Sequence, residues 1–143
     1  MTTPQSERRI LVTGAAGFVG SALCAKLSAA GFDVVRALRR IRQPEPNDVA
    51  VGDIGPGTDW QPVLRHVGCV IHLAARTHVN REHSGDPLAE YRRSNVASTV
   101  NLAQAAANSG IKRFVFMSSV KVNGEHTVGR PFGENDAPRP EDA

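Results

Sequence analysis

The sequence predicts an α/β fold in which a parallel sheet carries helices on both faces. Two observations support this prediction. Short apolar runs typical of strands alternate with longer stretches of helical periodicity along most of the 143 residues. The first apolar run, residues 9–13, leads into glycines spaced G-x-x-G-x-x-G and then into a helical stretch. With right-handed crossovers, this alternation gives a doubly wound sheet with strand order 3-2-1-4-5.

Five strands are expected, because five short apolar runs are bounded by turn residues. They lie at about residues 9–13, 33–38, 49–51, 69–73 and 113–118. Three helices are expected at residues 17–30, 59–66 and 87–109. Each helix has a boundary signal, either a glycine after its end or a cap and proline at its start. These signals are Gly31 for the first helix, Thr58 or Asp59 for the second, and Asp86, Pro87 and Gly110 for the third.

The glycine turn after the first strand predicts a binding site for the pyrophosphate of a dinucleotide. Backbone N–H groups at a helix N-terminus lack partners and meet the positive end of the helix dipole, so they favour phosphate. Gly14 would allow the tight turn, Gly17 the close approach of backbone to phosphate, and Gly20 the packing of the helix on the sheet. The alternative is a strand-turn-helix unit without a ligand.

Composition argues against several classes of function. The hydrophobic content is 41% and the charged content is 22%, as in ordinary soluble domains. No apolar run is long enough to span a bilayer, and residues 1–9 lack the apolar centre of a signal peptide. The formal net charge is +3. Nucleic acid is still not an expected partner, because the arginines follow no helix face and aromatic residues are few.

The cysteines and histidines favour neither a disulfide nor a metal site. Cys24 and Cys69 stand alone on elements expected to be buried, which favours reduced thiols in a cytoplasmic protein. No metal is expected, because the histidines lack the short paired spacing of ligands on one helix face. They are His66, His72, His78, His83 and His126.

The end of the second strand bears on the choice of cofactor. A site for NAD usually carries an acidic residue there, which binds the ribose 2′-hydroxyl. Asp33 comes too early in the strand, and Arg39 and Arg40 stand at the expected place. Because guanidinium pairs with phosphate in a bidentate manner, these arginines favour the 2′-phosphate of NADP over NAD. The alternative is a solvated basic turn.

Four segments together resemble the extended short-chain dehydrogenase/reductase superfamily, in particular its NAD(P)-dependent nucleotide-sugar epimerase/dehydratase branch. They are residues 13–20 (TGAAGFVG), 52–54 (GDI), 72–75 (HLAA) and 114–119 (FVFMSS). The segments follow in the right order over nearly the whole chain. The resemblance implies a Rossmann-type fold, NAD or NADP as cofactor, a nucleotide-sugar substrate and a homodimer in the intact enzyme.

The resemblance also implies roles for single residues. Asp53 and Ile54 would contact adenine, and residues 73–75 would line the ribose and pyrophosphate. That segment is Leu73, Ala74 and Ala75, and the other residues with an implied place near the cofactor are Phe18, Val19, Asn95 and Ser118. Independently of the resemblance, Arg76, Thr77 and His78 follow the fourth strand and are candidates for contact with the sugar diphosphate. The alternatives are a turn position for Asp53, strand-end packing for residues 73–75, a solvated helix position for Asn95 and an ordinary polar loop for Thr77.

Ser119 is the expected catalytic residue, because the resemblance places its hydroxyl where it would hydrogen-bond a sugar oxygen during hydride transfer. The alternative is its neighbour Ser118, which would face the other way on a strand. The family's Tyr-x-x-x-Lys pair is missing: the only tyrosine is Tyr91, and Asn95 stands four residues later. We therefore expect residues 1–143 to be an incomplete dinucleotide-binding domain. It would end before the sixth strand, lack the C-terminal substrate-binding part and be inactive alone.

Three functional hypotheses follow. The resemblance favours the cofactor-binding part of a nucleotide-sugar epimerase of the UDP-glucose 4-epimerase type, with hydride transfer at sugar C4. Residues 122–124 read Val-Asn-Gly where many epimerases have Val-Tyr-Gly, so a 4-keto nucleotide-sugar reductase or dehydratase is an alternative. The third hypothesis is a non-catalytic regulatory module that binds NADP.

Self-association is expected from apolar surface at two places. Residues 115–117 would lie at an unpaired sheet edge, which is a hazard for strand pairing. One face of the 87–109 helix would lack a neighbouring helix, and the resemblance places a dimer interface there. The residues expected on that face are Leu88, Val96, Val100, Leu102 and Ala103.

Overall fold

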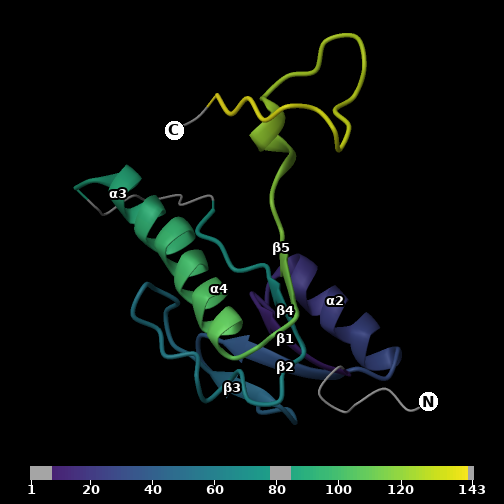
Figure 1. The fold of residues 1–143 in the computed structure, drawn as a ribbon, viewed down its shortest axis with the longest axis vertical. Coiled ribbons are helices and arrows are strands. Elements are labelled where there is room, and N and C mark those ends of the chain that lie inside the picture. The colour runs from purple at the N-terminus through teal and green to yellow at the C-terminus, as the bar shows by residue number, and fades with distance from the viewer. Residues whose placement is uncertain (1–7, 78–84, 142–143) are drawn as a thin grey trace.

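A computed structural model describes residues 8–77 and 85–141 of the chain, so His78, His83 and the first seven residues lie outside the described part. It contains one parallel sheet in the order β3-β2-β1-β4-β5, which confirms the predicted topology (Figure 1). The strands are β1 (Arg9–Thr13), β2 (Asp33–Leu38), β3 (Asp48–Ala50), β4 (Cys69–His72) and β5 (Arg113–Phe116).

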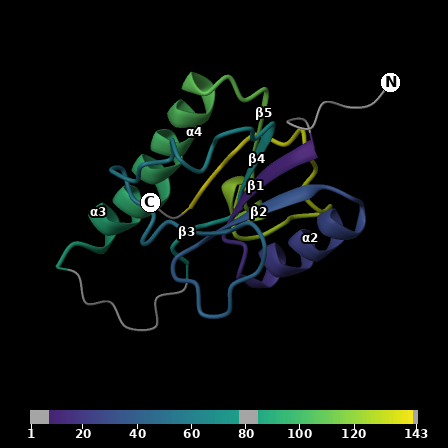
Figure 2. The ribbon, with the colours of Figure 1, turned by 90° about the horizontal axis from the view of Figure 1, so that it is seen from below.

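Helices cover both faces of the sheet and complete a three-layer arrangement. Helix α2 (Phe18–Ala29) lies on one face. On the other face lies a long helix made of α3 (Pro87–Tyr91), the π-helical segment η1 (Arg92–Ala97) and α4 (Ser98–Asn108). Figure 2 shows the two helices on opposite sides of the sheet.

The core follows from the alternation of side chains along buried strands. On the α2 side, Ile10, Val12, Val34 and Cys69 pack with Cys24 of the helix. On the α4 side, residues of the same strands at the alternate positions pack with a tryptophan and the helix. This second cluster includes Leu11, Val35, Val70, Trp60, Leu102 and Ala106.

The long helix begins and ends where the sequence predicts. The Asp86 carboxylate accepts a hydrogen bond from the backbone N–H of Ala89 at 2.9 Å, and Pro87 occupies the first turn. At the other end Gly110 has φ +73°, and the N–H of Ile111 bonds the Ala106 carbonyl at 3.0 Å. Within the helix, η1 is a departure from the expected α-helix. Serine and threonine hydroxyls bond carbonyls four residues back there and at its end, a pattern that distorts helices.

The predicted helix at residues 59–66 is wrong, because the structure has turns there. The Trp60 carbonyl accepts from Val63 and Leu64 at 3.0 Å each, which forms a single turn. The Asp59 carboxylate accepts from the Gln61 N–H at 3.0 Å, and this local bond competes with helix formation. His66 then adopts φ +60°, which ends any helix.

Both cysteines, Cys24 and Cys69, are free and buried. Burial raises the pKa of each thiol, so both stay protonated at neutral pH. Within residues 8–77 and 85–141, no helix has the length and apolar content that a bilayer crossing requires.

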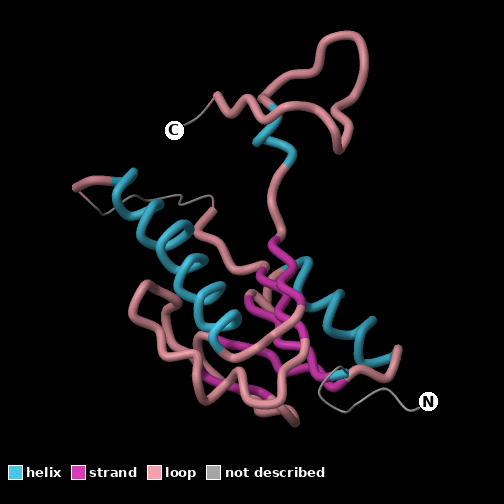
Figure 3. Tube along the Cα trace, viewed as in Figure 1, coloured by secondary structure: helices cyan, strands magenta, loops and turns pink. Residues whose placement is uncertain are grey.

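Residues 118–141, after β5, extend away from the sheet (Figure 1). Figure 3 shows them as loop apart from the short 3-10 helix η2 (Val120–Asn123). Their internal order comes from polar contacts, since Arg130 pairs with the Asp136 carboxylate and the Asn123 amide donates to the Asp136 carbonyl at 3.1 Å.

We expect the chain to self-associate through the outer face of the long helix. Val96 is 59% exposed and Val100 is 48% exposed. Leu102, expected on this face, is instead fully buried in the core, so the exposed stripe is narrower than predicted. Light scattering at tens of micromolar should give a mass that rises with concentration. Val96→Lys with Val100→Lys should lower it, and Ser28→Lys, at an exposed polar position of α2 on the other face of the sheet, should not. A monodisperse monomer would contradict the prediction.

Candidate functional site

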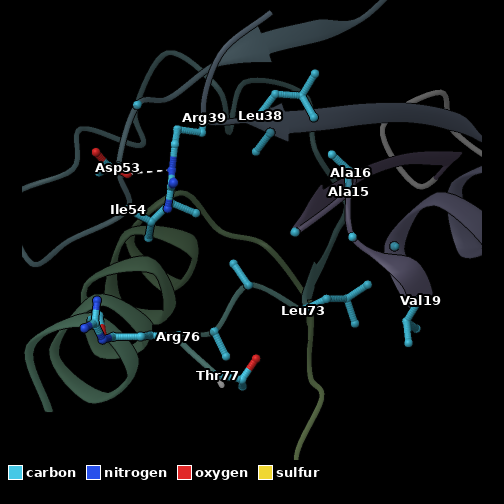
Figure 4. Close-up of a pocket in the computed structure, with 18 of the residues that line it drawn as sticks. Ala15, Ala16, Val19, Leu38, Arg39, Asp53, Ile54, Leu73, Arg76 and Thr77 are labelled. Atoms are coloured by element: carbon cyan, nitrogen blue, oxygen red, sulfur yellow. Dashed lines mark ion pairs between the residues drawn. The ribbon is translucent and has the colours of Figure 1, made fainter. Parts of the chain in front are cut away.

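A pocket of about 920 Å³ lies at the carboxyl ends of β1, β2 and β4. The order of the sheet reverses between β1 and β4, which is where doubly wound sheets bind ligands. Figure 4 shows side chains from distant segments of the sequence around this pocket. Its walls come from residues 14–20, 37–39, 52–54 and 73–77, and from Glu90, Arg93 and Ser94 on the long helix.

The floor of the pocket is the glycine turn at the start of α2. Gly14 has φ +66°, and a Cβ atom on it would lie 2.8 Å from the backbone nitrogen of Ala74. A Cβ atom on Gly20 would lie 2.1 Å from the Gly14 carbonyl oxygen, so helix and turn touch backbone to backbone. Gly17 caps α2 without any side-chain hydrogen bond. The first N–H groups of the helix therefore remain available to an anionic ligand.

Charged side chains stand along one side of the pocket. The Arg39 guanidinium pairs with the Asp53 carboxylate at 2.6 Å, and both side chains are largely exposed (Figure 4). Arg93 donates to both oxygens of Glu90, at 3.0 and 2.7 Å, and these bonds lower the pKa of the Glu90 carboxyl. Arg76 lies over the Tyr91 ring, 5.5 Å from its centroid. Exposed ion pairs contribute little to stability, so a ligand can compete for them at small cost.

A buried hydrogen-bond network supports the opposite wall. The Thr13 hydroxyl accepts from the N–H groups of Leu73 and Ala74, both at 3.2 Å, and lies 2.6 Å from Nδ1 of His72. Nε2 of His72 lies 3.0 Å from the Thr99 hydroxyl. Burial lowers the pKa of His72, which therefore stays neutral at pH 7.

Arg76 follows this wall in the sequence, and Asn95 of the long helix holds its backbone in place. The Asn95 amide oxygen accepts from the backbone N–H of Arg76 at 2.6 Å, and its amide nitrogen donates to the Arg76 carbonyl at 3.0 Å. Asn95 does not line the pocket itself. Its place in the structure is a bridge from η1 to the segment after β4.

The structure brings most of the predicted site residues to the pocket. Those that line it are Gly14, Gly17, Phe18, Val19, Gly20, Arg39, Asp53, Ile54, Leu73, Ala74, Ala75 and Thr77. Arg40, Ser118 and Ser119 do not line it. The Ser119 hydroxyl caps η2 and accepts from the Lys121 N–H at 3.3 Å. The roles assigned to all these residues stay predictions.

Sequence reasoning missed Glu90, Arg93 and Ser94, and the network around His72. The i, i+3 spacing of Glu90 and Arg93 indicates a helical ion pair, but such pairs are common on solvated helix faces. Nothing in the local sequence shows which face of the long helix meets the pocket. The link from Thr13 to His72 joins neighbouring strands and becomes visible only once their register is known.

Comparisons with known proteins agree with this geometry. The profile of the NAD dependent epimerase/dehydratase family matches residues 10–142. A UDP-glucose 4-epimerase from Vibrio cholerae is 44% identical over 138 residues, which is 94% of this chain and 42% of that protein. A 2-alkyl-3-oxoalkanoate reductase from Stenotrophomonas maltophilia is 34% identical over 141 residues, covering 94% of this chain and 40% of that protein.

The structural comparison gives the same result. The solved structure of MoeE5 in complex with UDP-glucuronic acid and NAD matches with a TM-score of 0.76 and 36% identity, over 92% of this chain and 43% of that one. The chain thus spans about two fifths of the length of these relatives. The family profile covers the glycine turn, the strand order and the pocket walls together. The chain belongs to the NAD dependent epimerase/dehydratase family.

Proposed function

We propose that the pocket binds NAD or NADP, with the pyrophosphate at the N-terminus of α2. The single observation that carries the proposal is the glycine turn, which lines the pocket and caps α2 without a side-chain hydrogen bond to the first N–H groups of the helix. The residues that line the pocket suit a bound dinucleotide. Beyond the turn, Asp53 and Ile54 stand where an adenine amino group and ring could meet a carboxylate and an aliphatic side chain.

The proposed reaction is hydride transfer at C4 of a nucleotide sugar, as in a UDP-glucose 4-epimerase. When bound, the nicotinamide supplies the hydride acceptor and donor. Residues of this chain would orient it: the backbone of residues 73–75 forms one wall, and Thr77 stands at its end. Support comes from the Vibrio cholerae relative and from the UDP-sugar complex among the solved structures.

The proton partner of that reaction is not supplied by the tyrosine of this chain. Tyr91 is its only tyrosine, and its ring lies under the Arg76 guanidinium. We therefore propose that the 143 residues alone bind cofactor without turnover. A reductase is the second candidate, favoured by the Stenotrophomonas maltophilia relative, whose name describes reduction of an oxo group.

The proposed preference for NADP depends on Arg39 and Arg40. Arg39 lines the pocket, whereas Arg40 does not. Asp33 is bound to Arg9 at 3.0 Å, and both residues stand at the first position of their strands, at the end of the sheet opposite the pocket. Asp33 thus cannot contact a ribose in the pocket. A 2′-phosphate would compete with Asp53 for the Arg39 guanidinium.

Replacing Arg39 by aspartate should reverse the preference. The ratio of NADP affinity to NAD affinity should fall about tenfold or more, because a phosphate contact is replaced by repulsion. Calorimetric titration of both cofactors into the unchanged chain and Arg39→Asp measures this ratio. Arg42→Asp, an exposed position beyond the pocket lining, is the matched control and should leave it unchanged. Equal or tighter NAD binding by the unchanged chain would contradict the NADP preference. Failure of both cofactors to bind would contradict the proposed function.

A further inference from the structure

The segment after β4 is held in place by a chain of buried hydrogen bonds that no ligand contact explains. Thr13 and His72 are the last residues of β1 and β4 and stand opposite each other in the parallel register. Thr13 is 0% exposed and His72 is 1% exposed. A polar pair this deeply buried is costly unless its hydrogen bonds are complete.

The direction of each hydrogen bond can be assigned by counting protons. The Thr13 hydroxyl oxygen already accepts from the N–H groups of Leu73 and Ala74. Both of its lone pairs are then used, so the hydroxyl must donate its own proton to Nδ1 of His72, 2.6 Å away. Nδ1 is therefore the acceptor, and the ring proton is on Nε2.

The series of hydrogen bonds continues from the His72 imidazole to the long helix. Nε2–H of His72 donates to the Thr99 hydroxyl at 3.0 Å, and that hydroxyl donates to the Asn95 carbonyl at 2.6 Å. Every donor in this series of hydrogen bonds has an acceptor, and all the hydrogen bonds point the same way along it. Phe114 and Phe116 pack beside the imidazole, with ring centroids 6.2 and 6.1 Å away, and leave it no other polar partner among the described residues.

This series of hydrogen bonds holds the wall of the pocket and does not contact a ligand itself. The two N–H groups at its start belong to Leu73 and Ala74, which line the pocket. The same backbone touches the glycine turn, since a Cβ atom on Gly14 would lie 2.9 Å from the Leu73 carbonyl carbon. The distance between the two walls is thus set by the backbone that Thr13 holds and His72 orients.

We propose that His72 is a positioning residue, which in its Nε2–H form holds the backbone of residues 73 and 74 at the distance from the glycine turn that a dinucleotide requires. The role rests on the proposed function. A charged imidazole would direct a second donor at Thr13, whose oxygen has no lone pair left for it. The hydroxyl would then release one of the two backbone N–H groups.

Two substitutions separate this role from packing. Asparagine places an amide oxygen where Nδ1 of His72 stands, so His72→Asn keeps an acceptor for Thr13. Leucine fills the space and keeps no acceptor. We expect His72→Leu to weaken NAD binding about tenfold and His72→Asn to stay within about threefold of the unchanged chain. A purely packing role predicts the reverse order, because leucine suits a buried site better than asparagine. His126→Leu, at an exposed position, is the control.

The test combines calorimetry of these variants with nitrogen-15 spectra of the imidazole in the unchanged chain at pH 7. Spectra showing the Nε2–H form, together with the affinity order asparagine above leucine, are the expected result. The Nδ1–H form, or equal affinity of His72→Leu and the unchanged chain, would overturn the proposal. If the unchanged chain binds no dinucleotide, the proposed function fails and the positioning role falls with it. In that case the spectra still decide whether the hydrogen-bond direction is correct.

Discussion

Gly20→Ala should leave the chain largely unfolded. The added Cβ atom would lie 2.1 Å from the Gly14 carbonyl oxygen and 2.9 Å from the Ala15 Cα atom, and both are backbone atoms that no side-chain rotation can move away. Helix α2 would have to shift away from the sheet that it covers. We expect a loss of about 3 kcal/mol or more in the free energy of unfolding, at the upper end for overpacked sites.

Urea unfolding monitored by circular dichroism measures this loss, and two other glycines give the comparison. Gly57 has no atom within 4 Å of an added Cβ, so Gly57→Ala should unfold as the unchanged chain does. Gly17→Ala should fold, with a loss of about 1 kcal/mol or less, yet bind cofactor poorly. Its Cβ atom would stand on the pocket floor, 3.2 Å from the Gly14 carbonyl oxygen. A Gly20→Ala chain as stable as the unchanged one would contradict the packing account.

Asp48→Ala should be the most destabilising charge change at the edge of the sheet. Asp48 and Arg36 stand opposite each other in the β2–β3 register, and two hydrogen bonds of 2.6 and 2.7 Å join them. The Asp48 side chain is 1% exposed and that of Arg36 is 25% exposed. Removing the carboxylate leaves a partly buried guanidinium whose remaining carboxylate partner among the described residues is Glu45, at 3.2 Å. We expect a loss of about 2–3 kcal/mol, since Arg36 keeps some solvent.

The pH dependence of the free energy of unfolding tests the Arg36–Asp48 pair in a second way. The hydrogen bond from Arg36 lowers the pKa of Asp48 below its ordinary value of 3.8. The folded state therefore binds this proton less readily than the unfolded state, so the pair stabilises the fold fully above that value. The stabilisation is lost as the pH falls through the lowered pKa. Below about pH 4 the unchanged chain should lose stability more steeply than Asp48→Ala does.

Chemical denaturation of both chains between pH 3 and 7 checks this prediction. The Arg39–Asp53 pair is the matched control, because its distance is also 2.6 Å while its side chains are 75% and 80% exposed. Asp53→Asn should change stability by about 0.5 kcal/mol or less. Equal effects of Asp48→Ala and Asp53→Asn would contradict the assignment of the buried pair.

The strand order was predictable because each of its signals is local. Apolar runs at residues 9–13 and 33–38 match β1 and β2, and Asp86, Pro87 and Gly110 mark the ends of the long helix as observed. The glycine turn was recognised from its local spacing, although only Gly20 and Gly17 are crowded by atoms of the turn itself. Gly14 is crowded by the distant backbone of residues 73 and 74.

What could not be predicted depends on contacts between distant residues. The apolar spacing of Trp60, Val63 and Leu64 suits a helix, but their burial is achieved by turns. Leu102 was expected at the surface, but it packs in the core on the α4 side of the sheet. The orientation of the long helix decides that Arg93 faces the pocket and that Asn95 reaches the backbone of Arg76. The periodicity of apolar residues in the sequence does not indicate this orientation of the helix.

The central claim is that the glycine turn binds the pyrophosphate of a dinucleotide. The most direct measurement is a titration of NAD and NADP followed in proton–nitrogen correlation spectra of the labelled chain. Saturable shifts are expected for the amides of residues 14–20, 52–54 and 73–77, which line one pocket. Amides of residues 104–108, at the end of α4 that leads into the first residue of β5 and so lies at the end of the sheet opposite the pocket, should stay unchanged. Unchanged amides in residues 14–20 at saturating concentrations of both cofactors would contradict the account.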